Sequence, residues 1–330
     1  MVFLTHVWAA KNQGKIDLGL LDQPVLAFLN EVIERDTVTT VINDKLSITS
    51  DDFRLQSPRA PSTETRRFTA NPLWGRPLLR TVDPDPLSRH VPTPTLVMSK
   101  ASLASLYHEG QQRYGQQFTV DLGYYFEAYV GRQLQQLPGA RVLPEITYGR
   151  DQRQSVDWIV IFDDLVVIVE AKGMSPVEAI RTADTTLQET LVNKFGKAVK
   201  QIRTTSQLIQ QENAAFAEVP PNRPIIGLVV TLEQFYLTNS PAFPQVREAL
   251  DDAGLPIIAV SIDELEHLVA LSDDQPSSVL RQYPNVARQT GGDLKSHLLT
   301  MEYGSNQVLD SAWESLEWIT DRVPHKISRQ

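Results

Sequence analysis

From about residue 101 onward, the order of apolar and polar positions predicts alternating helices and strands. In FTVDLGYYFEAYVGRQLQQL, residues 118–137, apolar side chains recur every three or four positions, which is typical of an amphipathic helix. Residues 175–213 and 263–272 also have helical patterns. Apolar, mostly β-branched runs predict strands at 140–148, 156–162, 165–172, 224–233 and 255–262. Interleaved strands and helices indicate an α/β fold, with a mixed β-sheet core flanked by helices over residues 101–272.

Two regions flank this predicted core. Residues 1–100 form an N-terminal region that is rich in proline and arginine from about residue 53. The stretch 53–100 holds eight of the 21 prolines, and eight Lys or Arg against three Asp or Glu. Proline at this density breaks helices and interior strands, so we expect extended, loop-rich chain. Two roles for this basic segment stay open, which are contact with a polyanion and docking onto the acidic remainder of the same chain.

The last segment, residues 273–330, predicts a helical C-terminal extension. In SAWESLEWITDRV, Trp313, Leu316 and Ile319 recur on one helical face. Such an apolar face suits packing onto the core, a homodimer or a partner protein.

Composition places the chain among globular proteins. It has 42% hydrophobic and 22% charged residues, a net charge of −9 and no cysteine, which excludes disulfides and thiolate metal sites. No apolar run approaches the roughly 20 residues of a membrane-spanning helix. The start, MVFLTHVWAA, lacks a basic leader. We therefore expect a cytoplasmic protein without a membrane partner.

Charged residues interrupt the apolar hairpin SVDWIVIFDDLVVIVEAKG, residues 155–173. If the strands are joined by a tight turn at residues 163–164, the residue numbers of opposed positions add up to the same value throughout the hairpin. Asp157 then faces Glu170. Opposed side chains share a face, about 4.5–5.5 Å apart at Cβ. Lys172 lies two residues from Glu170 and shares that face as well. The three charged groups are thus predicted to converge.

Two opposed carboxylates are destabilising unless a cation lies between them. A divalent ion with oxygen ligands would serve, and Mg²⁺ favours one or two carboxylates plus waters. Asp157 and Glu170 are the candidate metal ligands, with the Ala171 backbone carbonyl as a further one. Lys172 would then orient a water or stabilise negative charge. The alternative is a solvated salt-bridge cluster on an edge hairpin, worth roughly 0–1 kcal/mol.

A further carboxylate, Glu127, lies in the helix that precedes the hairpin. Gly123 and Gly131 flank it at four-residue spacing and share its face, which would let a backbone or a substrate approach closely. The alternative is an ordinary solvent-facing glutamate.

The order of these elements resembles the PD-(D/E)XK nuclease superfamily, the fold of many restriction endonucleases and DNA-repair nucleases. The resemblance covers roughly residues 115–270. The order of the helix, the two strands and their charged residues is specific, whereas the short residue motif by itself is not. Val156 departs from the motif, because the P in the superfamily name stands for a proline directly before the first acidic residue. The resemblance implies a metal-dependent phosphodiesterase that uses Mg²⁺, for which Mn²⁺ would substitute. It implies these catalytic residues: Glu127 on the helix, which is also a further candidate metal ligand, Asp157 at the first acidic position, and Glu170 and Lys172 as the ExK pair.

A basic helical face follows the hairpin. In NKFGKAVKQIRTT, residues 193–205, no acidic residue interrupts the run. Side chains here would contact phosphates without reading base sequence, although a solvated helix face would look the same. The candidates for nucleic-acid binding are Lys194, Lys197, Lys200, Gln201 and Arg203.

Two functions remain open. One is a Mg²⁺-dependent endonuclease that acts on DNA in restriction, phage defence or repair. The other is a non-catalytic nuclease-fold module that binds DNA or a partner protein. Other chemistries lack their motifs, since the sequence contains no HExxH pair, no Walker loop and no G-x-S-x-G.

Overall fold

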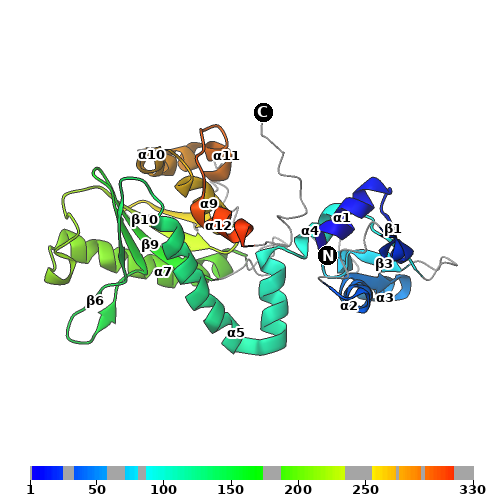
Figure 1. Cartoon of the computed structure of the whole chain (residues 1–330). Coiled ribbons are helices and arrows are strands. Elements are labelled where there is room, and N and C mark those ends of the chain that lie inside the picture. Colours follow the sequence, from blue (N-terminus) through cyan, green and yellow to red (C-terminus); the bar gives the residue numbers. More distant parts are fainter. Residues whose placement is uncertain are drawn as a thin grey trace. The chain divides into compact units, whose positions relative to one another are not determined.

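A computed structural model describes residues 2–24, 33–57, 71–80, 87–173, 187–234, 255–272, 275–290 and 294–315 (Figure 1). Contacts divide the chain into two compact units. The first comprises Met1–Arg113 with Arg181–Ala183, and the second comprises Tyr114–Ile180 with Asp184–Gln330. Each unit has its own buried core, so each is described by itself.

The first unit is built on a four-stranded sheet with the order β1-β4-β3-β2. Strand β4 is antiparallel to β1 and β3, and β2 is parallel to β3. Ile16, Ile42 and Leu78 lie in its buried apolar core. The elements are α1 (Val2–Lys11), β1 (Lys15–Asp17), α2 (Arg35–Thr40), β2 (Ser47–Thr49), α3 (Ser50–Gln56), β3 (Leu78–Arg80), β4 (Ser88–His90) and α4 (Pro94–Ser99).

Residues 53–100 contain more regular structure than the extended chain predicted from their prolines. Their described parts include the end of α3, strands β3 and β4, and helix α4, while 58–70 and 81–86 fall outside the described residues. Pro94 lies in the first turn of α4, where its missing N–H leaves no helical hydrogen bond unmade. Proline therefore marks a helix start here, which proline density alone does not reveal.

Two basic side chains of this segment are used inside the first unit. Arg80 donates to the Asn43 carbonyl at 2.8 Å, and Arg89 donates to Asn43 Oδ1 at 2.6 Å. Arg89 is also buried. These contacts favour docking onto the chain itself over contact with a polyanion for these two arginines.

The second unit contains a five-stranded mixed sheet with the order β11-β10-β9-β8-β5. Strands β5, β8 and β9 are antiparallel, whereas β9, β10 and β11 are parallel. A two-stranded hairpin of β6 (Thr147–Tyr148) and β7 (Arg153–Gln154) joins β5 to β8. This arrangement confirms the predicted mixed sheet. The strands are β5 (Arg141–Pro144), β8 (Trp158–Ile161), β9 (Val166–Lys172), β10 (Ile225–Thr231) and β11 (Ile257–Ser261).

The hairpin of β8 and β9 has the predicted register. Trp158 pairs with Val169, Ile161 pairs with Val166, and the Phe162 N–H donates to a carbonyl across the turn at 2.8 Å. Continued by one position, this register sets residue 157 opposite residue 170. The regular ladder ends at Trp158, so the charged positions lie directly beyond its last pair.

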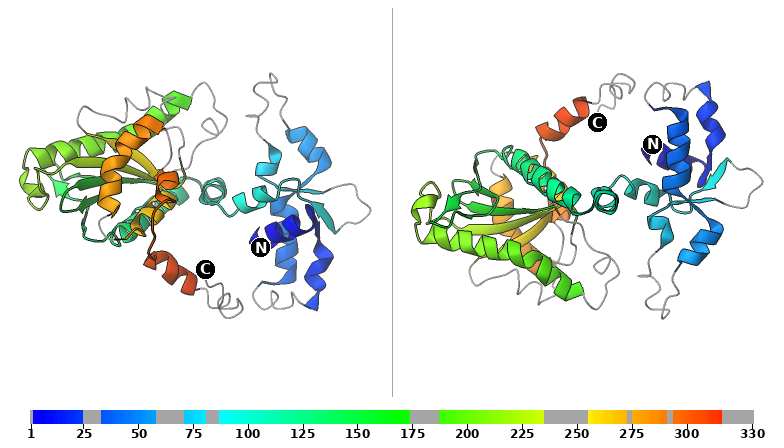
Figure 2. Two further views of the ribbon diagram at one scale, coloured as in Figure 1. Left: turned by 90° about the horizontal axis from the view of Figure 1, so that it is seen from above. Right: turned by 90° about the horizontal axis from the view of Figure 1, so that it is seen from below.

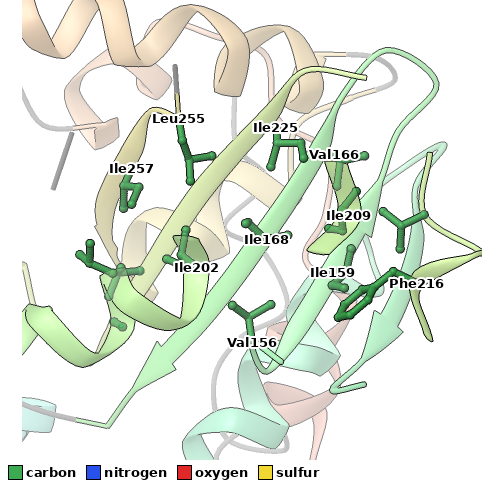
Figure 3. Close-up of a cluster of buried hydrophobic side chains, with 14 of the residues drawn as sticks. Val156, Ile159, Val166, Ile168, Ile202, Ile209, Phe216, Ile225, Leu255 and Ile257 are labelled. Carbon is green, nitrogen blue, oxygen red and sulfur yellow. The ribbon is translucent and has the colours of Figure 1, made fainter. Parts of the chain in front are cut away.

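Helices cover both faces of this sheet. Figure 2 shows α7 (Leu187–Gln210) on one face. On the other face lie α9 (Ile262–Val269) and the part of α5 (Leu103–Leu134) that follows its kink at Gly115. Isoleucines of β8, β9 and α7 meet in the core beneath α7, and a Cβ at Gly227 would lie 2.6 Å from Ile202 Cγ2, so glycine makes room for this packing (Figure 3). Helices are confirmed within 118–137, 187–210 and 263–269, while 174–186 fall outside the described residues.

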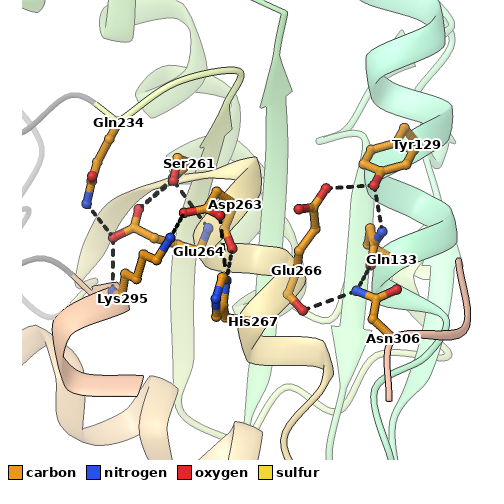
Figure 4. Close-up of polar contacts among 10 residues, drawn as sticks. All are labelled: Tyr129, Gln133, Gln234, Ser261, Asp263, Glu264, Glu266, His267, Lys295 and Asn306. Atoms are coloured by element: carbon orange, nitrogen blue, oxygen red, sulfur yellow. Dashed lines mark hydrogen bonds and ion pairs between the residues drawn. The ribbon is translucent and has the colours of Figure 1, made fainter. Parts of the chain in front are cut away.

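The C-terminal extension is helical in its described part. Its helices are α10 (Gln275–Thr290), α11 (Leu294–Leu298) and α12 (Gln307–Glu314). Asn306 caps α12 and donates to Gln133 Oε1 at 2.9 Å and to the Glu266 carbonyl at 3.1 Å (Figure 4). Tyr129 donates to Glu266 at 2.6 Å. This network fastens α5, α9 and the extension together. Residues 316–330, which include Leu316 and Ile319, fall outside the described residues.

None of the helices in the described part of the chain is long and apolar enough to cross a membrane.

Candidate active site

The site lies where β8 and β9 stop pairing. Backbone N–H groups that lose their ladder partner need another acceptor when they are buried. Here the Ala171 N–H donates to Asp157 Oδ2 at 2.7 Å. The Asp157 carboxylate therefore holds the end of β9, and the register sets the two acidic groups side by side.

Glu170 is deeply buried, with 1% of its side chain exposed. One carboxylate oxygen, Oε1, accepts from Lys172 Nζ. The other, Oε2, is buried and has no hydrogen-bond partner among the described residues. The Lys172 side chain is 28% exposed, so its ammonium lies between the buried carboxylate and the surface. The predicted convergence of Asp157, Glu170 and Lys172 is thus present in the fold.

Electrostatics oppose ionisation of the two carboxylates. Burial, with a smaller contribution from the nearby Asp157 carboxylate, raises the pKa of Glu170 to about 7, although the Lys172 ammonium acts in the opposite direction. Burial also raises the pKa of Asp157, against the hydrogen bond from Ala171 and the charge of Lys172. The lysine therefore offsets the negative charge only in part, and the site retains an excess of it.

Glu127 approaches from α5 on the other side of the sheet. Trp158 Nε1 donates to the Glu127 carbonyl at 3.1 Å, which fixes the helix against the start of β8. Burial raises the pKa of Glu127, and so do the charges of Asp157 and Glu145. The Glu127 carboxylate therefore interacts electrostatically with Asp157 and Glu145, and its catalytic role stays a prediction.

The two glycines that flank Glu127 differ in what they do. A Cβ at Gly131 would lie 2.1 Å from the Trp158 ring, so this glycine admits a close approach, although of a side chain and not of the predicted backbone or substrate. A Cβ at Gly123 would meet nothing within 4 Å. The space beside Gly123 is open, so the predicted approach of a substrate at Gly123 stays a prediction. Its backbone does lie beside the end of β9, since a Cβ at Gly173 would be 3.3 Å from Gly123 Cα.

Glu145 is an acidic neighbour that the sequence analysis missed. Pro144 pairs with Trp158 across β5 and β8, so the next position along sets Glu145 opposite Asp157. Its Oε1 is buried with no hydrogen-bond partner among the described residues, and burial and Asp157 both raise its pKa. The constant-sum rule that gave the hairpin register would have found it, had the pairing of β5 with β8 been assumed.

The carboxylates of the site provide the oxygen ligands that a divalent cation needs. Within the described residues, no group of three or more histidine, aspartate or glutamate side chains is arranged to hold a metal ion. Two carboxylates do converge, and one buried oxygen of Glu170 lacks a partner. Mg²⁺ typically takes one or two protein carboxylates and completes its shell with water. The two carboxylates fit such an ion, and the Ala171 carbonyl stays the predicted third protein ligand.

Helix α7 contacts the segment that leads into the site through one polar side chain. Gln201 Nε2 donates to the Ser155 carbonyl at 3.5 Å, two residues before Asp157. Lys197 and Lys200 are exposed. The amphipathic orientation predicted for this helix is confirmed, because its apolar side chains are buried in the core: Phe195, Val199 and Ile202. The predicted contact residue Arg203 is half-buried, and the side chain of Lys194 falls outside the described residues.

A family model matches the part of the chain that holds the candidate site. Residues 122–232 match the family model described as nuclease-related domain, and the match spans Glu127, Asp157, Glu170 and Lys172. The predicted resemblance to the PD-(D/E)XK nuclease superfamily is confirmed. No curated protein matches the chain in sequence. Among solved structures, the small subunit of the heterodimeric restriction endonuclease R.BspD6I is similar at a TM-score of 0.31 and 12% identity, and the similarity covers 61% of this chain and 98% of that one.

Proposed function

We propose that the nuclease-related domain of this chain hydrolyses phosphodiester bonds in DNA with the help of a divalent metal ion. The observation that carries the proposal is the pairing of Asp157 with Glu170 at the end of β9, with an unpartnered, buried carboxylate oxygen and a lysine in contact. Buried charge is costly unless it is paired or binds a metal. The excess of negative charge therefore supports cation binding.

Asp157 and Glu170 would hold the ion, with the Ala171 carbonyl beside them. A bound Mg²⁺ supplies Lewis-acid polarisation of a phosphate oxygen and a more acidic water. Lys172 is held at the Glu170 carboxylate and partly exposed, so its ammonium is placed to orient a nucleophile or to stabilise negative charge on the phosphate. Glu127 adds negative potential at the same place, which suits a supporting metal contact.

The α7 surface supports a nucleic-acid substrate. Lys197 and Lys200 are exposed on the helix whose Gln201 reaches the strand entering the site. Exposed lysines on one helix neutralise phosphates and position a nucleic-acid strand without reading its sequence. The net charge of −9 makes such a local basic surface necessary for binding any polyanion.

The test is cleavage of linear, circular and single-stranded DNA, and of RNA, in Mg²⁺, Mn²⁺ or EDTA. We expect activity on DNA that EDTA abolishes. Asp157→Asn and Glu170→Gln should each abolish cleavage, and Lys172→Met should abolish it while a divalent ion still binds. Asp163→Asn is the matched control, because it removes an exposed acid from the turn of the same hairpin. Wild-type cleavage by folded Asp157→Asn would show that the site is assigned wrongly.

A non-catalytic binding module is the second candidate. It is favoured by the direct contact of Lys172 with Glu170, which already gives the buried carboxylate one cationic partner. In that case DNA or a partner protein would bind, EDTA would have no effect, and none of the four substrates would be cleaved.

A further inference from the structure

Helix α5 carries a solvent-exposed aromatic side chain beside the candidate active site. Tyr124 is 69% exposed, although single exposed aromatics are common on protein surfaces and do not by themselves indicate binding. Its position is what distinguishes it. Tyr124 precedes Glu127 by three residues, and side chains at this spacing are neighbours on a helix surface, about 5–6 Å apart at Cβ.

Two close approaches fix this face of α5 along the hairpin. Gly131 lies against Trp158 at the start of β8, and Gly123 lies against Gly173, directly after Lys172 at the end of β9. Glu127 is four residues from each glycine, so it lies between the two contacts on the same side of α5, at the height of the candidate active site. Tyr124 directly follows Gly123, so its backbone lies near the end of β9, while its side chain is turned about 100° around the helix from the Gly123–Gly173 contact.

Helical side chains lean toward the N-terminus of their helix. The Tyr124 side chain therefore points away from Glu127, toward the end of β9 and beyond it. That direction agrees with its high exposure, because the strand gives it no packing partner there. A phosphodiester held at Asp157, Glu170 and Lys172 would therefore have its neighbouring nucleotide at this ring.

We propose that Tyr124 is a stacking platform for an unpaired base of the substrate strand, next to the phosphate that is cleaved. The proposal rests on the proposed nuclease function and narrows its substrate class to DNA with single-stranded character at the cut. An exposed ring accepts any base, because every base has a flat π-face. A base inside a duplex is already stacked on its neighbours and cannot lie on Tyr124 without being extruded.

The chain offers a matched control in the adjacent residue. Tyr125 is 76% exposed and lies on the same helix, but its two-residue offset from Glu127 turns it to roughly the opposite side of α5. Removing either ring should leave the fold intact, because neither is buried. Only the loss of Tyr124 should affect a bound strand.

The experiment measures fluorescence anisotropy of a labelled 20-nucleotide oligothymidylate in EDTA, so that binding is read without cleavage. The proteins are wild type, Tyr124→Ala, Tyr124→Trp and Tyr125→Ala. We expect Tyr124→Ala to weaken binding about 5- to 150-fold, in line with roughly 1–3 kcal/mol per stacked base. Tyr124→Trp should bind like wild type, as should Tyr125→Ala. A label on a 20-base-pair duplex should show a smaller loss for Tyr124→Ala.

An abasic strand of equal length provides the decisive comparison. If Tyr124 stacks on bases, wild type and Tyr124→Ala should bind the abasic strand equally. Equal losses on the abasic and normal strands would overturn the proposal, because the ring would then contact the backbone. Binding by Tyr124→Ala as tight as that by Tyr125→Ala would overturn it as well. Failure of the nuclease proposal appears separately, as absence of Lys172-dependent cleavage, whereas the anisotropy still reports on stacking.

Discussion

The contact between Gly131 and Trp158 yields a quantitative test of how Glu127 is held. In Gly131→Ala, the new methyl group would lie 2.1–2.6 Å from three atoms of the Trp158 ring. The ring cannot turn aside without losing its hydrogen bond to the Glu127 carbonyl at 3.1 Å. Overpacking typically costs about 1–3 kcal/mol, a lost hydrogen bond about 1 kcal/mol, and alanine returns about 1 kcal/mol of helix propensity. We expect a net loss of about 1–3 kcal/mol.

Gly123→Ala is the matched control on the same face of α5. Its Cβ enters open space, so only the helix-propensity gain of about 1 kcal/mol applies. The two variants should therefore differ by about 2–4 kcal/mol, with opposite signs relative to wild type. Thermal unfolding of the full chain, followed by circular dichroism, should separate their midpoints by roughly 4–16 °C.

The same substitution has a functional consequence. Displacing Trp158 displaces the backbone of Glu127, so Gly131→Ala should also slow cleavage, whereas a merely destabilised protein would regain full activity at a lower temperature. If Gly131→Ala melts at or above Gly123→Ala, the close packing of α5 on β8 is not what fixes Glu127, and the reasoning is refuted.

Three further results are expected. Asp157→Asn keeps an acceptor for the Ala171 N–H but removes a repelling charge, so in EDTA it should melt at or above the temperature of the wild type. It should also lose the stabilisation by Mn²⁺, which is about 2.7 kcal/mol at a metal concentration of 100 times the dissociation constant. Melting well below the wild type in EDTA would indicate a structural salt bridge. Glu264→Gln should cost roughly 1–3 kcal/mol in urea unfolding, because the buried carboxylate accepts from several backbone N–H groups that a side-chain amide cannot all satisfy. Replacing Lys197 and Lys200 together by glutamine should reduce the slope of log K against log salt for DNA binding by about 1.4–1.8, and an unchanged slope would remove both lysines from the interface.

The hairpin was predictable because its strand register depends only on the two strands and the turn between them. Two apolar runs joined by a short acidic turn admit few registers, and the tight turn at residues 163–164 sets Asp157 opposite Glu170. The buried face of α7 was predictable for a similar reason, since Phe195, Val199 and Ile202 repeat at helical spacing around an uninterrupted basic run.

What the sequence could not yield depends on long-range pairing. Glu145 joins the site only because β5 pairs with β8, and no local pattern announces that partner. The different surroundings of Gly123 and Gly131 depend likewise on where the Trp158 ring and the end of β9 fall against α5. The small sheet of the first unit was missed because its three-residue strands are too short to show a period.

The end of the β8–β9 ladder bears on the choice between a site and a salt bridge. A structural ion pair would need one carboxylate and one ammonium, and Glu170 with Lys172 already supplies both. Asp157 adds a second acid at the same register, and Glu145 adds a third on its other side, although each raises the free energy of the folded, metal-free protein. Such repulsion is common at functional sites, where a ligand relieves it. The surplus of carboxylates, rather than the presence of an ion pair, is therefore the feature that a cation-binding function explains and a stabilising role does not.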